Sequence, residues 1–141
     1  MASAMDGAVS PGFASYMHEM GGLGVLNAEG LYSRYEDPYA VLEEIISHPQ
    51  ESVTEFLQKV YSEPIREDLI GQRVREIKNT GATCAVSFTP QNTKRMSSAA
   101  VEAGADMVVV QSTVNCNRCY GINDSWRLRH VGHQRLTLAY Q

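Results

Sequence analysis

The chain has 141 residues, of which 43% are hydrophobic and 20% are charged, and its formal net charge is −4. This length allows one domain with one core, and the composition excludes an intrinsically disordered chain. No apolar run approaches the roughly 20 residues that span a bilayer, and no basic segment precedes an apolar one at the N-terminus, so we expect neither a membrane anchor nor a secretion signal.

Cysteine usage and charge add two further expectations. Three cysteines are an odd number, unevenly placed, which argues against a disulfide framework and favours a reducing, cytoplasmic setting. Residues 1–114 hold eight Lys or Arg against fifteen Asp or Glu, whereas residues 115–141 hold four Arg and one Asp. The two parts therefore look like different kinds of sequence.

The predicted elements begin with an unusual opening, MASAMDGAVSP. An apolar stretch runs into an Asp-Gly turn and then into Ser10-Pro11, an N-cap followed by a first helical residue, which is typical of the end of a strand that leads into a helix. The elements predicted after it are a helix to about residue 20, a strand over 23–27, a helix from Asp37-Pro38 to His48-Pro49, helices over about 51–61 and 67–79, a strand over 84–88, a loop over 89–92, a helix over 93–105 and a strand over 106–112.

This alternation predicts βα units with a parallel sheet. About four strands are expected, the first of them cut short, whereas a (β/α)8 barrel needs about 250 residues. The elements alone leave open a small doubly wound sheet and a part of a barrel. In the second case the chain holds at most half of a barrel.

Two motifs invite a ligand and fit poorly. GGLGVLN over 21–27 fails the G-x-G-x-x-G spacing because Asn27 stands where the last glycine should be, and its glycines precede the strand, so a helix end and a tight turn are favoured. CNRC with two histidines offers a zinc site or a nucleic-acid contact, but its C-x2-C-x10-H-x2-H spacing is shorter than that of a zinc finger. The residues of that second motif are Cys116, Cys119, His130 and His133.

Several polar residues follow the predicted strands, at the edge where parallel α/β folds bind ligands. They are Ser3, Met5, Asp6, Thr89, Gln111, Ser112 and Thr113. Serine and threonine after a strand are also ordinary helix caps, and Met5 could fill a gap in a core.

Four segments, in this order, resemble the IMP dehydrogenase/GMP reductase family, and within it the bacterial IMP dehydrogenase-related branch that lacks the CBS regulatory pair. They are ASAMDGAVSP, GGLGVLNAEGLYSRYEDP, TCAVSFTPQN and AAVEAGADMVVVQST. The resemblance covers residues 1 to about 114 and does not extend into residues 115–141. It implies the fold of a partial (β/α)8 TIM barrel, from the end of the first strand through about the fourth, so that MASAMD is the end of the first barrel strand.

The resemblance also implies a site. Ser3 and Met5 match residues that contact the base and ribose of a purine nucleotide (IMP, XMP or GMP), and Asp6 completes the turn. Thr89 matches a threonine beside the adenine of the cofactor, NAD or NADP, although Pro90 stands where IMP dehydrogenases have histidine. The stretch of Gln111, Ser112 and Thr113 matches a D-S-S sequence that helps to hold the cofactor, and a neutral Gln removes a charged acceptor for ribose hydroxyls.

The family attacks C2 of the purine with a cysteine in a G-x-x-C-x-T loop after the sixth strand, and this sequence has no such loop. Cys84 lies in a predicted strand, where a buried thiol is expected, and Cys116 and Cys119 lie outside the resemblance. We therefore expect no catalytic residue, no metal and no activity from this chain alone.

Only residues 48–66 or so fill the place of the CBS insertion, so nucleotide regulation through CBS modules is not expected. Full-length relatives are homotetramers.

Residues 115–141 do not continue the resemblance. One hypothesis is that a frameshift near codon 115 or a truncated gene replaced the native continuation, and such a tail would show no cooperative structure and no stoichiometric zinc. The alternative is a small α/β binding module whose tail holds zinc or nucleic acid. Apart from that alternative, we expect the chain to bind neither nucleic acid nor a membrane.

Overall fold

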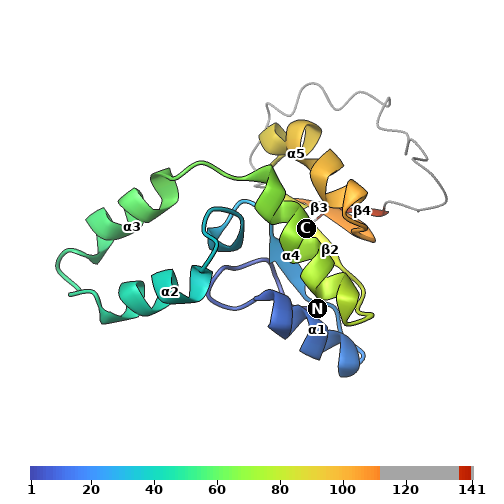
Figure 1. Ribbon diagram of the computed structural model, residues 1–141, viewed down its shortest axis with the longest axis horizontal. Coiled ribbons are helices and arrows are strands. Elements are labelled where there is room, and N and C mark those ends of the chain that lie inside the picture. Colours follow the sequence, from blue (N-terminus) through green and yellow to red (C-terminus); the bar gives the residue numbers. More distant parts are fainter. Residues whose placement is uncertain (112–136, 141) are drawn as a thin grey trace.

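The computed structural model describes residues 1–111 and, in addition, the backbone of residues 137–140. In chain order, the helices and strands are α1 (Pro11–Glu19), β1 (Val25–Asn27), the 3-10 helix η1 (Leu31–Ser33), α2 (Pro38–Ser47), α3 (Val53–Ser62), α4 (Glu67–Asn79), β2 (Ala85–Phe88), α5 (Pro90–Glu102), β3 (Met107–Val110) and β4 (Thr137–Tyr140). Figure 1 shows the strands together, with a pair of helices extending to one side.

The predicted helix starts are confirmed at two N-caps. Ser10 Oγ accepts a hydrogen bond of 3.0 Å from Phe13 N, and Asp37 Oδ1 accepts one of 3.1 Å from Ala40 N. In both helices a proline follows the cap, where its missing N–H costs nothing. The same rule corrects the loop predicted over 89–92, because α5 already begins at Pro90.

The strands form a parallel sheet. In the described part of the chain the order is β1-β2-β3-β4, with Val25 opposite Ala85 and Ala85 opposite Met107. The opening segment lies on the other side of β1, where Ala2 forms a parallel bridge with Gly24. The predicted strand end at the start of the chain therefore does run beside the next strand.

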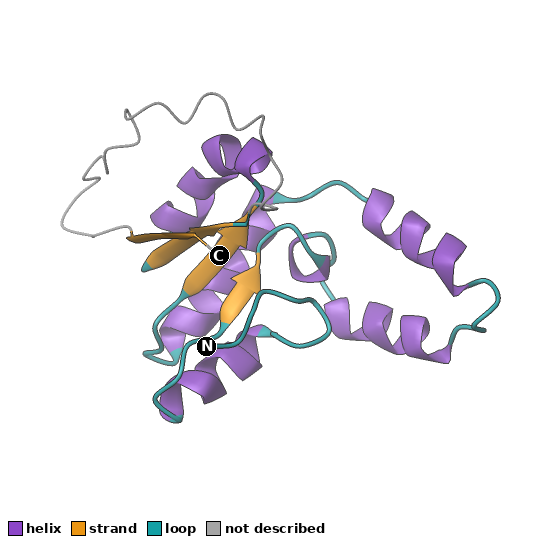
Figure 2. Cartoon of the chain, turned by 180° about the vertical axis from the view of Figure 1, so that it is seen from behind, coloured by secondary structure: helices purple, strands orange, loops and turns teal. Residues whose placement is uncertain are grey.

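Helices α1, α4 and α5 cover one face of this sheet, as Figure 2 shows. Helix α4 lies between α1 and α5, and the main core is formed where these helices meet the strands. Strands that follow one another in chain order, with right-handed crossovers, place all their helices on the same side, as in a barrel. A doubly wound sheet has helices on both faces, and in the described part of the chain α1, α4 and α5 pack on one face, as in a barrel segment or in one half of a doubly wound sheet.

Alternate strand residues supply the two faces. The helix-covered face carries Leu26, Val86 and Val108, each at most 2% exposed. A second buried cluster on the strands consists of smaller side chains: Ala4, Val25, Ala85 and Val109. Val108 and Val109 are both buried, so β3 is buried on both faces, as is typical of strands in parallel sheets.

The glycine-rich segment after α1 serves packing. Gly21 has φ +74°, and Gly22 N donates to Met17 O over 2.7 Å, which ends the helix. A Cβ at Gly24 would lie 2.8 Å from Ala14 Cα, so only glycine allows α1 to pack this closely on the sheet. The helix end and tight turn expected for GGLGVLN are thus what the structure contains.

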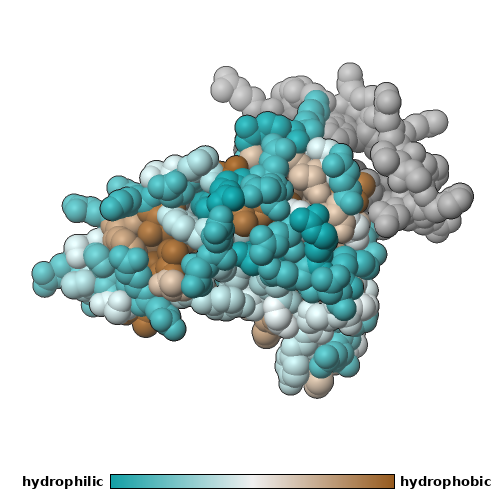
Figure 3. Space-filling model, in the orientation of Figure 1, coloured by the Kyte–Doolittle hydropathy of each residue, from teal (hydrophilic) through white to brown (hydrophobic). Residues whose placement is uncertain are grey.

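Helices α2 and α3 form a hairpin, residues 38–62, that extends away from the sheet. Its apolar side chains are incompletely covered, and Ile46 is 82% exposed. Figure 3 shows apolar residues gathered over this part of the molecule. Among the described residues, no helix has the length and apolar character needed to cross a membrane.

The sequence analysis identified no element in residues 115–141, yet residues 137–140 form β4. It pairs in parallel with β3, with Met107 opposite Thr137 and Val110 opposite Tyr140. Thr and Tyr are favoured in strands, so a local signal for this element was present. The possible metal ligands Cys116, Cys119, His130 and His133 lie outside the described residues.

Candidate functional site

The predicted ligand-binding residues that the structure describes lie along one edge of the sheet, where the strands end. Asp6 follows the opening segment, Asn27 ends β1, Thr89 follows β2 and Gln111 follows β3. Parallel strands end at a common edge, and Gln111 N donates to Phe88 O over 2.8 Å, which joins two of these ends directly. We call this set of strand ends the carboxyl edge.

Ser3 and Met5, the predicted nucleotide contacts, are exposed at this edge, and the Met5 residue is 58% exposed. The carbonyl oxygen of Met5 accepts hydrogen bonds from Ala8 N at 3.0 Å and Val9 N at 2.9 Å. The turn predicted from the Asp-Gly pair is therefore present, and it holds Met5 next to Asp6.

Asp6 is tied to two distant segments. Its Oδ2 accepts a hydrogen bond of 3.1 Å from Leu31 N and one of 2.7 Å from the Tyr61 hydroxyl. Its Oδ1 is buried and has no hydrogen-bond partner among the described residues. A Cβ at Gly30 would lie 1.8 Å from that oxygen, so Gly30 is required for the carboxylate to fit here.

Tyr61 lies in the last turn of α3, and its contact with Asp6 changes the pKa of its hydroxyl. Burial, and then the hydrogen bond to the Asp6 carboxylate, raise the pKa of Tyr61 well above its usual value. The hydroxyl therefore stays protonated and donates at neutral pH.

A second carboxylate, Glu29, lies in the loop after β1 and contacts the residues that follow β2. It accepts hydrogen bonds from the Thr89 backbone N–H, from the Thr89 hydroxyl at 2.9 Å and from Asn92 Nδ2 at 2.9 Å. Thr89 is the N-cap of α5 and makes no cap bond with its own side chain. Glu29 thus satisfies the start of α5 from another loop and places a negative charge at the positive end of that helix.

We expect Glu29→Ala to lower the free energy of unfolding by about 1 to 2 kcal/mol. The substitution leaves the backbone N–H of Thr89, the Thr89 hydroxyl and the side-chain amide of Asn92 without their acceptor. Urea unfolding followed by circular dichroism measures the change. Glu43→Ala is the matched control, because Glu43 is an exposed glutamate on α2. Equal losses in the two variants would contradict the capping role.

The cofactor residues predicted at the end of β3 are only partly described. Gln111 is half-buried at the carboxyl edge, whereas Ser112 and Thr113 lie outside the described residues. The structure brings Thr89 and the neutral Gln111 to adjacent strand ends and adds Glu29, which the sequence analysis did not identify. The Thr89 hydroxyl also lies 3.2 Å from the second oxygen of Glu29, so both carboxylate oxygens accept hydrogen bonds from the start of α5.

Cys84 directly precedes β2 and is fully buried. Burial, followed by the nearby Asp106 carboxylate, raises the pKa of the Cys84 thiol to about 12. The expectation of a buried thiol in this strand region is confirmed, and such a thiol is a poor nucleophile at neutral pH.

The thiol of Cys84 is expected to react with a disulfide reagent only after unfolding. In a Cys116→Ser, Cys119→Ser background, labelling at about pH 8 is expected to be absent in buffer and complete in urea. The folded pKa of about 12 exceeds the ordinary 9.0, so unfolding releases this proton above pH 9. The thiol's contribution to stability is therefore fully present below pH 9 and is lost as the pH rises toward 12. Rapid labelling of the folded chain would contradict this burial.

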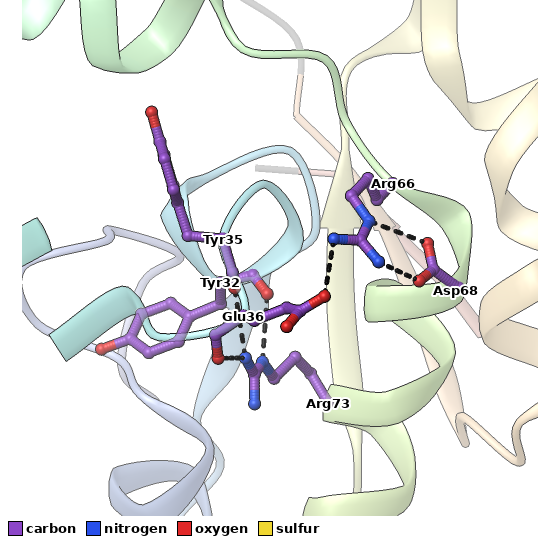
Figure 4. Close-up of polar contacts among 6 residues, drawn as sticks. All are labelled: Tyr32, Tyr35, Glu36, Arg66, Asp68 and Arg73. Carbon is purple, nitrogen blue, oxygen red and sulfur yellow. Dashed lines mark hydrogen bonds and ion pairs between the residues drawn. The ribbon is translucent and has the colours of Figure 1, made fainter. Parts of the chain in front are cut away.

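The loop after β1 is held by a buried arginine of α4, as Figure 4 shows. Arg73 is 6% exposed, and its guanidinium donates to Tyr32 O at 3.1 Å, Tyr35 O at 3.2 Å and Glu36 O at 2.7 Å. The side chain of Glu36 also pairs with Arg66 at 3.0 Å. These contacts fix the loop that carries Leu31, the donor to Asp6.

The sequence analysis missed Glu29, Gly30 and Tyr61. Glu29 follows β1 closely, so the rule that singled out Thr89 after β2 would have found it. Tyr61 carries no such signal, because it lies 55 residues from Asp6 and at the end of a helix. Among the described residues, no group of three or more His, Cys, Asp or Glu is placed to hold a metal ion.

Comparison with known proteins gives relatives but no matching family model. An uncharacterized oxidoreductase of Mycobacterium tuberculosis is 40% identical over 114 residues, which is 77% of this chain and 30% of the relative. Uncharacterized oxidoreductases of Mycolicibacterium smegmatis and Mycobacterium leprae are 38% and 37% identical. The first of these two alignments covers 77% of this chain and 30% of the relative, and the second covers 81% and 32%. The chain thus spans about a third of the length of the curated relatives it matches.

A solved structure resembles the whole chain. It is an IMP dehydrogenase/GMP reductase-like protein from Corynebacterium glutamicum, with a TM-score of 0.83 and 28% identity. The match covers 99% of this chain and 38% of that one. The chain is therefore similar in sequence to part of several oxidoreductases and similar in structure to part of an IMP dehydrogenase/GMP reductase-like protein.

Proposed function

We propose that this chain is a portion of an NAD(P)-dependent purine nucleotide oxidoreductase of the IMP dehydrogenase/GMP reductase type, and that its sheet forms one side of a (β/α)8 barrel. The observation that carries the proposal is the carboxyl edge, where the Asp6 turn and the Glu29–Thr89 pair lie at neighbouring strand ends. The likeness to oxidoreductases and to an IMP dehydrogenase/GMP reductase-like structure supports it.

In this proposal the Asp6 turn holds the purine nucleotide. Ser3 and Met5 are exposed side by side with the turn, and they offer a hydroxyl and a polarizable apolar surface to a ribose and a flat base. The buried Oδ1 of Asp6 is a hydrogen-bond acceptor without a partner among the described residues. The nucleotide is IMP, XMP or GMP.

The residues at the ends of β2 and β3 fit a hydroxyl-rich dinucleotide. Glu29 supplies the negative acceptor that the neutral Gln111 lacks, and Thr89 is oriented by its bonds to Glu29. These residues would hold a nicotinamide cofactor, which would supply hydride transfer at C2 of the purine. Thr89, Gln111, Ser112 and Thr113 orient NAD or NADP without transferring a proton.

The chain by itself is proposed to bind nucleotide without turning it over, since its sequence has no G-x-x-C-x-T loop and the described cysteine, Cys84, is buried with a protonated thiol. Calorimetric titration with IMP, XMP and GMP, with UMP as the pyrimidine control, tests binding. Absorbance of the reduced nicotinamide tests turnover with IMP plus NAD and with GMP plus NADPH.

We expect a purine nucleotide to bind at least about tenfold more tightly than UMP, a difference of about 1.4 kcal/mol. We expect Asp6→Asn to weaken that binding, while Glu43→Gln, on the exposed side of α2, leaves it unchanged. Equal binding of purine and pyrimidine nucleotides would overturn the nucleotide site, and enzyme-like turnover would overturn the proposed inactivity.

A further inference from the structure

The α2–α3 hairpin meets the rest of the described chain mainly at its base. The Tyr35 hydroxyl donates to Val60 O over 2.9 Å, and the Arg34 guanidinium donates to Glu63 O. Beyond these anchors the two helices extend away from the sheet, as Figures 1 and 2 both show. On α2, the Tyr39 ring contacts Tyr32 and Leu42 packs against the main core. The orientation of the hairpin therefore depends on contacts near the start of α2 and the end of α3.

One of these contacts reaches a predicted site residue. The Tyr61 hydroxyl, on the last turn of α3, donates to Asp6 Oδ2 over 2.7 Å. The Tyr61 ring lies beneath the Arg34 guanidinium, whose carbon is 5.9 Å from the ring centre. Tyr61 is thus held on one side by Arg34, in the loop after β1, and bonded on the other to the Asp6 turn.

Asp6 has few other restraints. Its Oδ2 accepts only one further described hydrogen bond, from Leu31 N, and its Oδ1 has no partner among the described residues. Removal of the Tyr61 hydroxyl leaves one donor on this side chain. Met5, which precedes Asp6, is held by backbone bonds of the same turn, so a shift of Asp6 shifts Met5 as well.

We propose that Tyr61 is a positioning residue for the nucleotide site, and that through its bond to Asp6 the orientation of the α2–α3 hairpin and nucleotide binding are coupled. The ligand in this inference rests on the proposed function. Coupling of this kind is reciprocal: if docking of Tyr61 raises nucleotide affinity, bound nucleotide stabilises the docked hairpin by the same factor.

The test compares the full chain with Tyr61→Phe and with Tyr39→Phe as matched control. Tyr39 is also on the hairpin, 54% exposed, and its ring contacts the edge of Tyr32. Calorimetry measures IMP affinity, and hydrogen exchange measures the Leu31 amide and the amides of residues 53–62, without and with IMP.

Tyr61→Phe is expected to weaken IMP binding by about threefold to tenfold, the usual effect of one lost hydrogen bond. It is also expected to speed exchange of the Leu31 amide. In the wild type and in Tyr39→Phe, IMP slows exchange in residues 53–62, and in Tyr61→Phe it does not. A merely structural tyrosine would not make α3 respond to IMP.

Two failures can be told apart. Equal IMP affinity in the wild type and in Tyr61→Phe overturns the coupling and leaves the proposed function standing. Absence of IMP binding in the wild type overturns the proposed function. In that case hydrogen exchange without ligand still tests the positioning role of Tyr61. If the Leu31 amide exchanges equally fast in the wild type and in Tyr61→Phe, that role is overturned.

Discussion

Replacement of Arg73 by methionine is expected to lower the free energy of unfolding by about 3 kcal/mol, because it leaves the carbonyl oxygens of Tyr32, Tyr35 and Glu36 without their donor and Glu76 without its ion-pair partner. Methionine keeps much of the volume of the side chain, so the loss reports the hydrogen bonds rather than a cavity. Urea unfolding of the full chain, followed by circular dichroism, gives the change.

Arg75→Met is the matched control for this prediction, since Arg75 lies on the same helix and is exposed. Its loss is expected to stay below about 0.5 kcal/mol. Arg73→Lys is expected to fall between the two, because an ammonium group carries the charge but not the planar fork that reaches several carbonyls. A loss for Arg73→Met no larger than the control's would show that the loop after β1 is held by something else.

Replacement of Phe88 by alanine is expected to cost about 3 to 5 kcal/mol. Phe88 ends β2, is 1% exposed and lies in the main core between the helices and the sheet. Its carbonyl accepts from Gln111 N, and Thr89 follows it directly, so the cavity opens immediately below the carboxyl edge. We therefore expect the amide resonances of Thr89 and Gln111 to shift as well.

Phe13→Ala is the control for the core prediction, because Phe13 lies on α1 and is 38% exposed. The urea midpoint is expected to fall far more for Phe88→Ala than for Phe13→Ala. A Phe88→Ala variant that is already unfolded in buffer would be the extreme form of the same result. Similar midpoints for the two alanine variants would show that the end of β2 does not contribute to the main core as described.

Both predictions concern the support of the site, and they differ in how visible that support is in the sequence. Phe88 stands in an apolar strand, so its burial follows from the local pattern. Arg73 stands in a helix with other charged residues, where a solvent-exposed position is the ordinary expectation. Its burial depends on three carbonyl oxygens that the loop over residues 32–36 brings to it.

The site residues divide in the same way, into those that the sequence indicates and those that only the tertiary structure brings to the site. Asp6, Thr89 and Gln111 could be singled out because they follow predicted strands, and parallel strands end at one edge. Glu29 follows β1 closely, so the same rule applies to it, although the sequence analysis did not use it there. Tyr61 completes the site from the last turn of an amphipathic helix, where the surrounding residues in the sequence do not indicate a ligand. Ser112 and Thr113 remain predictions, since they lie outside the described residues.

The sequence by itself determined the elements whose causes are local. The caps Ser10 and Asp37 bond to residues three positions away, and α4 begins and ends at the residues its apolar spacing predicts. Only the tertiary structure decided that Glu29 meets Thr89, 60 residues away, and that Tyr61 meets Asp6. The physical reason is that such contacts depend on the register of parallel strands and on the direction of a hairpin, which are set by the packing of the whole sheet and not by any short stretch of the chain.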